Sequence, residues 1–239
     1  WSVSLSADGK RVAIGAPQND GNDGTVSNSG HVRVYDFDST GSSWEQVGSD
    51  IDGEAVGDQS GYSVSLSADG TRVAIGGPYN DGNDGNGSYS GHVRVYKLDS
   101  TGNSWVQVGS DIDGEAARDF SGWSVSLSAD GTRVAIGARD NAENGSRSGH
   151  VRVYKLDSTG SSWVQLGSDI DGEAANDQSG YSVSLSADGT RVAIGAIYND
   201  GNDGNGYYDS GHVRVYKLDS TGNSWVQLGS DIDGEAAGD

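Results

Sequence analysis

Two short runs of alternating apolar and polar residues, joined by an Asp-Gly pair, recur four times along the chain. In the second copy, residues 63–67 read Ser-Val-Ser-Leu-Ser and residues 72–76 read Arg-Val-Ala-Ile-Gly. A period of two places successive side chains on opposite faces, so each run predicts a β-strand. The Asp69-Gly70 pair supplies the positive φ angles that a tight hairpin needs. We therefore expect a hairpin at the start of every copy.

Two further strands are expected in each copy. In the second copy, a polar loop over residues 80–90 precedes an apolar run at 92–98, and a turn at 99–103 leads to a fourth strand at 105–109. An acidic connector at 110–115 then leads to the next copy. No segment has helical periodicity or helix capping signals. Each copy therefore predicts a four-stranded antiparallel meander.

The copies start at Trp1, Tyr62, Trp123 and Tyr181, which divides the chain into repeats 1–61, 62–122, 123–180 and 181–239 of a single array. A fixed period of this size indicates stacked supersecondary units. Four short strands with a large aromatic at a set position are typical of a β-propeller blade. We predict an all-β fold, a β-propeller built of four-stranded antiparallel blades. The four blades either close alone or form part of a larger ring. The Ser-Gly pair that precedes the later copies is missing before Trp1, which favours the larger ring.

The amino-acid composition excludes several classes of function. The net charge is −20, so nucleic acid and anionic membrane surfaces are not expected partners. The chain has no cysteine, which excludes disulfides and thiolate chemistry. No apolar run approaches the roughly 20 residues of a transmembrane helix, so direct membrane insertion is not expected. The acidity suits divalent cations.

Short motifs in every copy resemble the FG-GAP repeat. The best match joins Phe120-Ser121-Gly122-Trp123 to Ala135-Ile136-Gly137-Ala138, and the run Gly91–Tyr96 is similar to the Gly-x-Val-x-Val-Tyr strand of that family. FG-GAP repeats build the seven-bladed propeller of integrin alpha chains and of related microbial surface proteins. The resemblance therefore implies an integrin-like, extracellular propeller that functions in cell adhesion.

The calcium loop of that family, Asp-x-Asp-x-Asp-Gly, is not carried over. A tight Asp-Gly hairpin stands in its place, as at Asp69-Gly70, and one carboxylate cannot supply the six to eight oxygens that calcium takes.

The connector Asp-x-Asp-Gly-Glu is the best metal candidate instead. Three carboxylates within five residues repel one another unless a cation or solvent screens them. The residues are Asp50, Asp52, Glu54, Asp111, Asp113, Glu115, Asp169, Asp171, Glu173, Asp231, Asp233 and Glu235. Calcium is the expected ion, and solvated turns with Asx hydrogen bonds are the alternative.

The polar loop between the second and third strands is the region where the copies differ most. Binding residues are often carried on loops that a rigid scaffold holds. We expect any ligand at this edge, on Asn19, Asp20, Asn22, Asp23, Tyr79, Asn80, Asp81, Asp84, Tyr198, Asn199, Asp200 and Asp203. The alternative is a hydrophilic loop without function.

The four histidines share one repeat position, represented by His150, and four tryptophans share another, represented by Trp163. A catalytic residue is normally unique, so these side chains are interpreted as structural. Near-identical copies also make a set of non-equivalent polar residues unexpected, and no nucleophile–base pair stands at a unique place.

These observations predict a non-catalytic, extracellular or cell-surface binding and adhesion module. Its expected partners are a surface protein or a glycan, with self-association as a further option. One alternative is a structural repeat protein that assembles into a filament, sheath or surface layer. A second alternative is a propeller enzyme that acts on polysaccharides.

Overall fold

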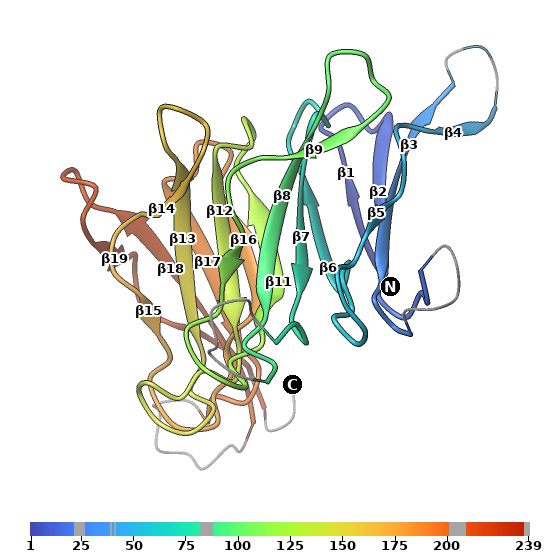
Figure 1. The fold of residues 1–239 in the computed structure, drawn as a ribbon. Coiled ribbons are helices and arrows are strands. Elements are labelled where there is room, and N and C mark those ends of the chain that lie inside the picture. Colours follow the sequence, from blue (N-terminus) through green and yellow to red (C-terminus); the bar gives the residue numbers. More distant parts are fainter. Residues whose placement is uncertain (22–26, 39, 41, 82–87, 201–208, 237–239) are drawn as a thin grey trace.

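The computed structural model describes residues 1–239 except 22–26, 39, 41, 82–87, 201–208 and 237–239. Its described part is all-β, with four sheets and no helix (Figure 1). Consequently no helix in these ranges could cross a membrane.

Each of the four sheets contains five corresponding strands. The first contains β1 (Ser2–Leu5), β2 (Arg11–Ala16), β3 (His31–Phe37), β4 (Trp44–Gln46) and β5 (Ile51–Asp52). The second contains β6 (Ser63–Leu66), β7 (Arg72–Gly77), β8 (His92–Leu98), β9 (Trp105–Gln107) and β10 (Ile112–Asp113). The third contains β11 (Ser121–Leu127), β12 (Arg133–Ala138), β13 (His150–Leu156), β14 (Trp163–Gln165) and β15 (Ile170–Asp171). The fourth contains β16 (Ser179–Leu185), β17 (Arg191–Ala196), β18 (His212–Leu218), β19 (Trp225–Gln227) and β20 (Ile232–Asp233).

Each sheet is the predicted antiparallel meander with its outer strand split in two. In the second sheet, β9 pairs with one end of β8 and β10 pairs with the other end. Gly109 between them has a φ of 74°, a conformation that glycine adopts without strain, and it turns the chain. The fourth strand therefore ends at Gln107, two residues earlier than expected, and part of the connector returns to the sheet as β10.

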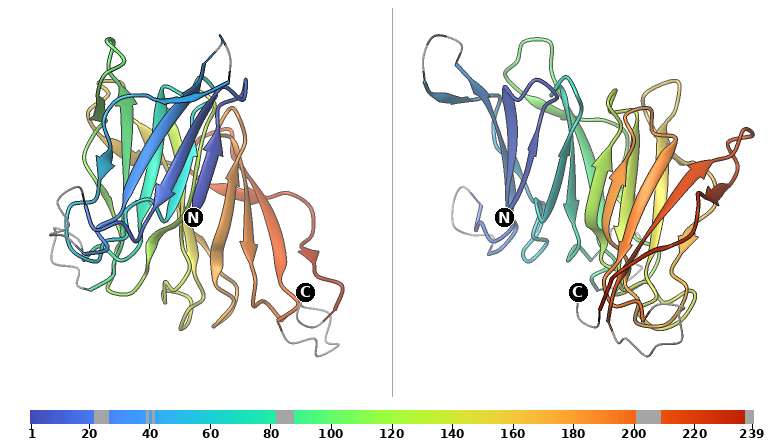
Figure 2. Two further views of the ribbon diagram at one scale, coloured as in Figure 1. Left: turned by 90° about the vertical axis from the view of Figure 1, so that its right-hand side faces the viewer. Right: turned by 180° about the vertical axis from the view of Figure 1, so that it is seen from behind.

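The four sheets are propeller blades that stand side by side in chain order. Figures 1 and 2 show the first blade (blue) and the fourth blade (red) at opposite ends of the row. The apolar cores lie between adjacent blades. Val32 and Val34 of β3, for example, pack in one cluster with Leu66, Val73 and Ile75 of the second blade.

Close contact between blades explains much of the repetition. The first three blades each have a second-strand glycine at which an added Cβ would overlap the carbonyl oxygen of the glycine that opens the next blade; Gly76 and Gly122 form one such pair. Trp105 Nε1 donates a 2.8 Å hydrogen bond to the Val47 carbonyl of the preceding blade, and later blades repeat this bond. The interpretation of the shared tryptophans as packing residues agrees with these contacts.

The polar loops and the acidic connectors gather at one edge of the molecule. Figure 1 shows the described ends of these loops at the lower edge, opposite the Asp-Gly hairpins. The polar loop and the connector of each blade both lie near the end of the third strand that carries the histidine. In the third blade, His150 opens β13 and pairs with Asp171 of β15. This edge therefore brings histidines, carboxylates and loop residues together.

Candidate functional site

The predicted loop residues fall into three groups. Asn22, Asp23, Asp84 and Asp203 lie outside the described residues. Asp20, Asp81 and Asp200 each accept a backbone N–H from the far side of the same loop, at 2.9–3.0 Å. Asn19 similarly accepts the backbone N–H of Gly21. These side chains close their loops, and their predicted role in ligand binding stays a prediction.

Asn80 and Asn199 are buried, whereas the tyrosines beside them are accessible. Asn199 donates a 2.9 Å hydrogen bond to the buried carboxylate of Asp177, and Asn80 bonds Asp58 in the same way. Tyr198 is 44 % exposed, and Tyr79 packs edge-on against Phe120 with ring centroids 5.3 Å apart. A ligand at this edge would therefore meet the tyrosines before the asparagines.

The carboxylates of one connector do not converge on one another. The first aspartate of each connector turns back to the histidine of its own blade. Asp111 Oδ2 lies 3.8 Å from His92 Nδ1, and Asp169 Oδ2 lies 3.8 Å from His150 Nδ1. Asp50 and Asp231 have the same relation to His31 and His212.

The glutamate of each of the first three connectors points to the following blade. Glu54 and Glu115 form 3.0 Å ion pairs with Arg94 and Arg152, and Glu173 forms a 3.1 Å pair with Arg214. The groups that could hold a metal ion therefore combine a histidine and an aspartate of one blade with the glutamate of the blade before it, as in Glu54, His92 and Asp111. The first such group is the exception, with His31, Asp50 and Asp52. The second aspartates of the later three connectors lie in short edge strands and are absent from these groups; they are Asp113, Asp171 and Asp233.

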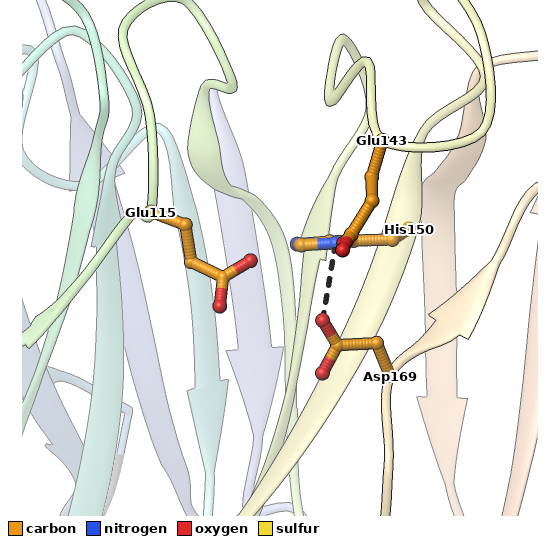
Figure 3. Close-up of side chains that lie close together, drawn as sticks. All are labelled: Glu115, Glu143, His150 and Asp169. Atoms are coloured by element: carbon orange, nitrogen blue, oxygen red, sulfur yellow. Dashed lines mark ion pairs between the residues drawn. The ribbon is translucent and has the colours of Figure 1, made fainter.

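The group in the third blade is the largest. It contains Glu115, Glu143, His150 and Asp169, whose nearest ligand atoms all lie within 4.8 Å of one another. Figure 3 shows the carboxylates of Glu115 and Asp169 directed toward the imidazole, with Glu143 above it. Glu143 is held in place by its loop, since its N–H donates to Asn141 Oδ1 at 3.0 Å.

His150 is buried without a hydrogen-bond partner. Its side chain is 1 % exposed, and neither ring nitrogen has a hydrogen bond to any described residue. Burial, followed by the positive charge of Arg152, lowers the pKa of His150 to about 4. The imidazole is therefore neutral near pH 7, and its Nδ1 lies 3.8 Å from the Asp169 carboxylate. Such a donor set fits a divalent metal ion, because neutral imidazole and carboxylates are common ligands.

A cavity of about 930 Å³ adjoins this group at the junction of the second and third blades. Glu115 and Glu143 belong to its lining, together with Tyr89, Arg118, Asp119, Phe120, Arg139, Asp140, Asn141, Ser146 and Arg147. Burial raises the pKa of the Glu115 and Asp119 carboxyl groups. The cavity thus combines cationic, acidic and aromatic groups.

Several lining residues have no equivalent in the other copies. Glu143 stands where the other copies have glycine, and Arg139 stands where they have proline or isoleucine. Phe120 replaces glutamine. Arg118 and Arg147 are likewise the only arginines at their repeat positions. The expectation that near-identical copies leave no set of non-equivalent polar residues was wrong, because these substitutions all fall at one junction.

Arg139 is anchored on a row of aromatic rings. Its guanidinium carbon lies 3.3 Å from the ring centroid of Trp123, a cation–π contact. Trp123 is flanked by Tyr62 and Tyr181, with ring centroids 4.4 and 5.7 Å away. The Arg139 side chain also lies 3.6 Å from the Asp140 carboxylate. A cation fixed in this way can bind an anionic ligand with little loss of side-chain entropy.

The sequence contained a signal for this site that the repeat argument did not use. The connector carboxylates were predicted as metal ligands, and Glu115 and Asp169 are among the residues brought together. His150, Glu143 and the arginines were missed. His150 was set aside because its type recurs in every blade, whereas the signal was the departure of the third copy from the other three over residues 139–147.

Comparison with solved structures shows the same fold in proteins assigned as lactonases. A Bacteroides uniformis protein and a Bacteroides fragilis protein, both assigned as 6-phosphogluconolactonases, match with TM-scores of 0.64 and 0.62 at 10 % and 11 % identity. The periplasmic gluconolactonase of Pseudomonas aeruginosa matches with a TM-score of 0.60 at 18 % identity. Each match covers 99 % of this chain but only 55 %, 55 % and 58 % of these three proteins. The chain therefore spans little more than half their length.

These matches correct two expectations. A non-catalytic adhesion module was expected from the FG-GAP resemblance, and the chain was expected not to be an enzyme because the near-identical copies have no unique nucleophile–base pair. These three proteins of the same fold are assigned as enzymes, so the repeated fold is no argument against catalysis. Among curated protein sequences, none matches this chain. The FG-GAP resemblance is confirmed: residues 111–154, from Asp111 through the Glu143 loop to Tyr154 within β13, match the FG-GAP repeat family.

Proposed function

We propose that this chain is a hydrolase of an anionic, sugar-derived ester, with a sugar lactone as the best candidate substrate. The proposal depends mainly on one observation, the polar cavity at the junction of the second and third blades, which contains residues that no other junction has. The lactonase assignments of proteins with the same fold support this choice of substrate class.

The arginines of the cavity suit the charged part of such a substrate. Arg118 and Arg147 are exposed at its rim, and Arg139 is held on Trp123. Guanidinium groups bind carboxylate and phosphate groups through paired hydrogen bonds. Phe120 and Tyr89 stack 5.9 Å apart beside them and offer apolar surface to a sugar ring. A sugar acid or sugar phosphate is therefore favoured over a neutral sugar.

The acidic side of the cavity suits ester hydrolysis. Lactone hydrolysis adds water to the ester carbonyl and breaks the bond to the ring oxygen, which leaves as a hydroxyl group. Glu115 lines the cavity and burial raises its pKa, so we assign to it the role of the base that accepts the proton of the attacking water. Glu143, His150 and Asp169 are the residues that would hold a divalent cation, which supplies polarisation of the carbonyl. The imidazole favours Mn²⁺ or Zn²⁺ over the calcium expected from the sequence, because calcium prefers oxygen ligands alone.

We further propose that the protein acts outside the cytoplasm. The absence of cysteine, the strong negative charge and the periplasmic location in the name of one protein with this fold support this. In this proposal, the glycan that was expected as a binding partner supplies the sugar from which the lactone substrate is derived.

A lactonase assay tests the proposal. The protein is treated with a chelator, reloaded with Mn²⁺, Zn²⁺ or Ca²⁺, and assayed for acid release from gluconolactone and from its 6-phosphate. We expect metal-dependent turnover, with the phosphorylated lactone preferred. Glu143→Gln and Asp169→Asn should each lower kcat by about 100-fold or more, as expected for loss of a metal ligand or a catalytic group.

The chain offers a matched control. Asp231 has the same relation to His212 as Asp169 has to His150, but the fourth blade has glycine at the position of Glu143. Asp231→Asn should leave turnover unchanged. Equal losses in Asp169→Asn and Asp231→Asn, or no hydrolysis of either lactone with any metal, would contradict the proposal.

A further inference from the structure

A histidine, an aspartate and a glutamate converge where the first blade meets the second. His92 opens β8, Asp111 directly precedes β10 of the same blade, and Glu54 belongs to the connector of the first blade. One ligand atom of each residue lies within 4.8 Å of those of the other two. The second copy has glycine where the third copy has Glu143, so this group has three members and is distinct from the larger group beside the cavity.

His92 is the buried member of this group. Its side chain is 1 % exposed, and its Nδ1 has no hydrogen-bond partner among the described residues. This nitrogen faces Asp111 Oδ2 at 3.8 Å, which is too long for a hydrogen bond. Burial of a polar atom without a partner is costly. The nitrogen therefore requires a partner that the described residues do not provide.

The two carboxylates are oriented by neighbouring side chains. Gln107 Nε2 donates a 2.6 Å hydrogen bond to Asp111 Oδ1, while the other oxygen, Oδ2, faces the imidazole. Arg94 Nη1 lies 3.0 Å from Glu54 Oε1 and holds that carboxylate at the junction. Outer side chains that orient the ligands in this way are typical of metal sites. The group therefore has both the ligand atoms and the contacts that fix them.

The fourth blade shows the same division of carboxylate oxygens. Glu173 Oε1 lies 3.1 Å from Arg214, whereas its Oε2 lies 3.9 Å from Nδ1 of His212. Asp231 Oδ2 lies 3.8 Å from the same nitrogen. The arrangement is thus a property of the junction between blades. The second blade offers the more enclosed example, because His212 also lines an open cavity of about 360 Å³.

The spacing of the ligand atoms suits a metal ion better than a water molecule. A tetrahedral Zn²⁺ bonded at about 2.0–2.2 Å keeps neighbouring ligand atoms about 3.4 Å apart, so the gap between His92 and Asp111 has to close by only about 0.4 Å. A water molecule bonded to both atoms at about 2.8 Å would have to hold an acute angle between them. Zinc binds imidazole nitrogen and carboxylate oxygen, and three protein ligands leave a fourth position for water.

The local charge also suits a divalent cation. Glu54 and Asp111 contribute two carboxylates and Arg94 contributes one guanidinium, so the group keeps a net negative charge within a chain of net charge −20. A cation between the carboxylates reduces their mutual repulsion. The Glu54 side chain is 40 % exposed, which gives an ion a path from solvent to the buried imidazole.

We propose that a Zn²⁺ ion binds Glu54, His92 and Asp111 and links the first blade to the second. Glu54 comes from one blade and the other two ligands come from the next, so the complete site exists only when the two blades are packed together. An ion that binds the folded chain alone stabilises it once its concentration exceeds the Kd. This role is structural and does not rest on the proposed lactonase activity.

Histidine NMR of the full chain tests the site directly. The chain has four histidines, so isotope-labelled imidazoles can be assigned, and His92→Gln identifies the His92 signal. The protein is treated with a chelator and then titrated with zinc chloride. We expect a saturable shift of His92 Nδ1 and a rise of about 5 °C in melting temperature at a 100-fold excess over the Kd. His150 reports the third-blade group separately, so failure of the lactonase assay leaves this result unaffected.

Matched variants identify the ligands. Asp111→Asn and Glu54→Gln should each lower the zinc affinity at His92 by about 100-fold or more, because each removes a ligand. Gln107→Ala should lower it by about tenfold, because it removes only an orienting hydrogen bond. Asp113→Asn is the matched control, since it makes the same substitution in the same connector but outside the group, and it should leave the affinity unchanged.

Circular dichroism confirms that the variants remain folded. An unchanged His92 signal at millimolar zinc would overturn the proposal. So would equal losses of affinity in Asp111→Asn and Asp113→Asn, or a zinc-induced rise in melting temperature that survives in His92→Gln.

Discussion

At the scale of single residues, the histidines show how burial determines protonation. His92 is 1 % exposed, and its Nδ1 lies 3.8 Å from Asp111. Burial, followed by the charge of Arg94, lowers the pKa of His92 from 6.5 to about 4. Desolvation therefore outweighs the attraction of the nearby carboxylate. The same balance holds at His150, so both imidazoles stay neutral near pH 7.

This neutral histidine gives a pH dependence of stability. Between pH 6.5 and about 4 the unfolded chain binds a proton at His92 that the folded chain does not bind, so the free energy of unfolding falls as pH is lowered. The difference between the two pKa values corresponds to about 3 kcal/mol. Urea unfolding at a series of pH values should show a smaller loss in His92→Gln than in the wild type. Identical pH profiles would show that His92 does not contribute.

Single residues also mark the limit of the sequence argument. Asp169 and Glu115 could be proposed as ligands because their connector is rich in carboxylates. Their partners could not, because His150 approaches Asp169 only when β15 pairs with β13, and Glu143 approaches both only through the fold of its loop. The repeated positions identified the scaffold correctly. The site depends on the few positions at which the third copy differs from the other copies.

At the scale of strands, the alternating pattern predicted the first three strands of the second blade almost to the residue. In the third and fourth blades the first strand begins earlier, at Ser121 and Ser179, with an irregular register near its start. In the third blade the central strand β12 pairs with β11 and β13 as a meander requires. The split outer strand was not predicted, because the alternating pattern does not show that the residues after the glycine turn pair again with the third strand. The turn has the same positive φ at Gly109 and at Gly229, 74° and 75°. Gly229 has no tryptophan beside it, so the turn forms without a contact to a following blade.

The second-strand glycines provide a test at this scale. A Cβ on Gly137 would overlap the carbonyl oxygen of Gly180, which is backbone and cannot move away freely. Gly137→Ala should therefore lower the free energy of unfolding by about 1–3 kcal/mol or more. Gly195→Ala is the matched control, because its Cβ would meet only the Ser182 side chain. Thermal unfolding of both variants at low protein concentration measures the difference, and equal effects would contradict the close-packing argument.

At the scale of the whole molecule, stability should vary along the row of blades. Repeat arrays gain much of their stability from contacts between neighbours. The second and third blades have a neighbour on both sides, whereas the first and fourth each have one open face. The free energy of local opening is therefore expected to be highest in the interior blades.

Hydrogen exchange measured on this chain tests the gradient. Amides of β2 and β17 should exchange about tenfold or more faster than the equivalent amides of β7 and β12, because terminal units open without disrupting a second interface. The junctions on both sides of the interior blades bury residues such as Val93 and Val151 completely, so these blades cannot open without disrupting two interfaces. Uniform exchange in all four blades would contradict the nearest-neighbour argument.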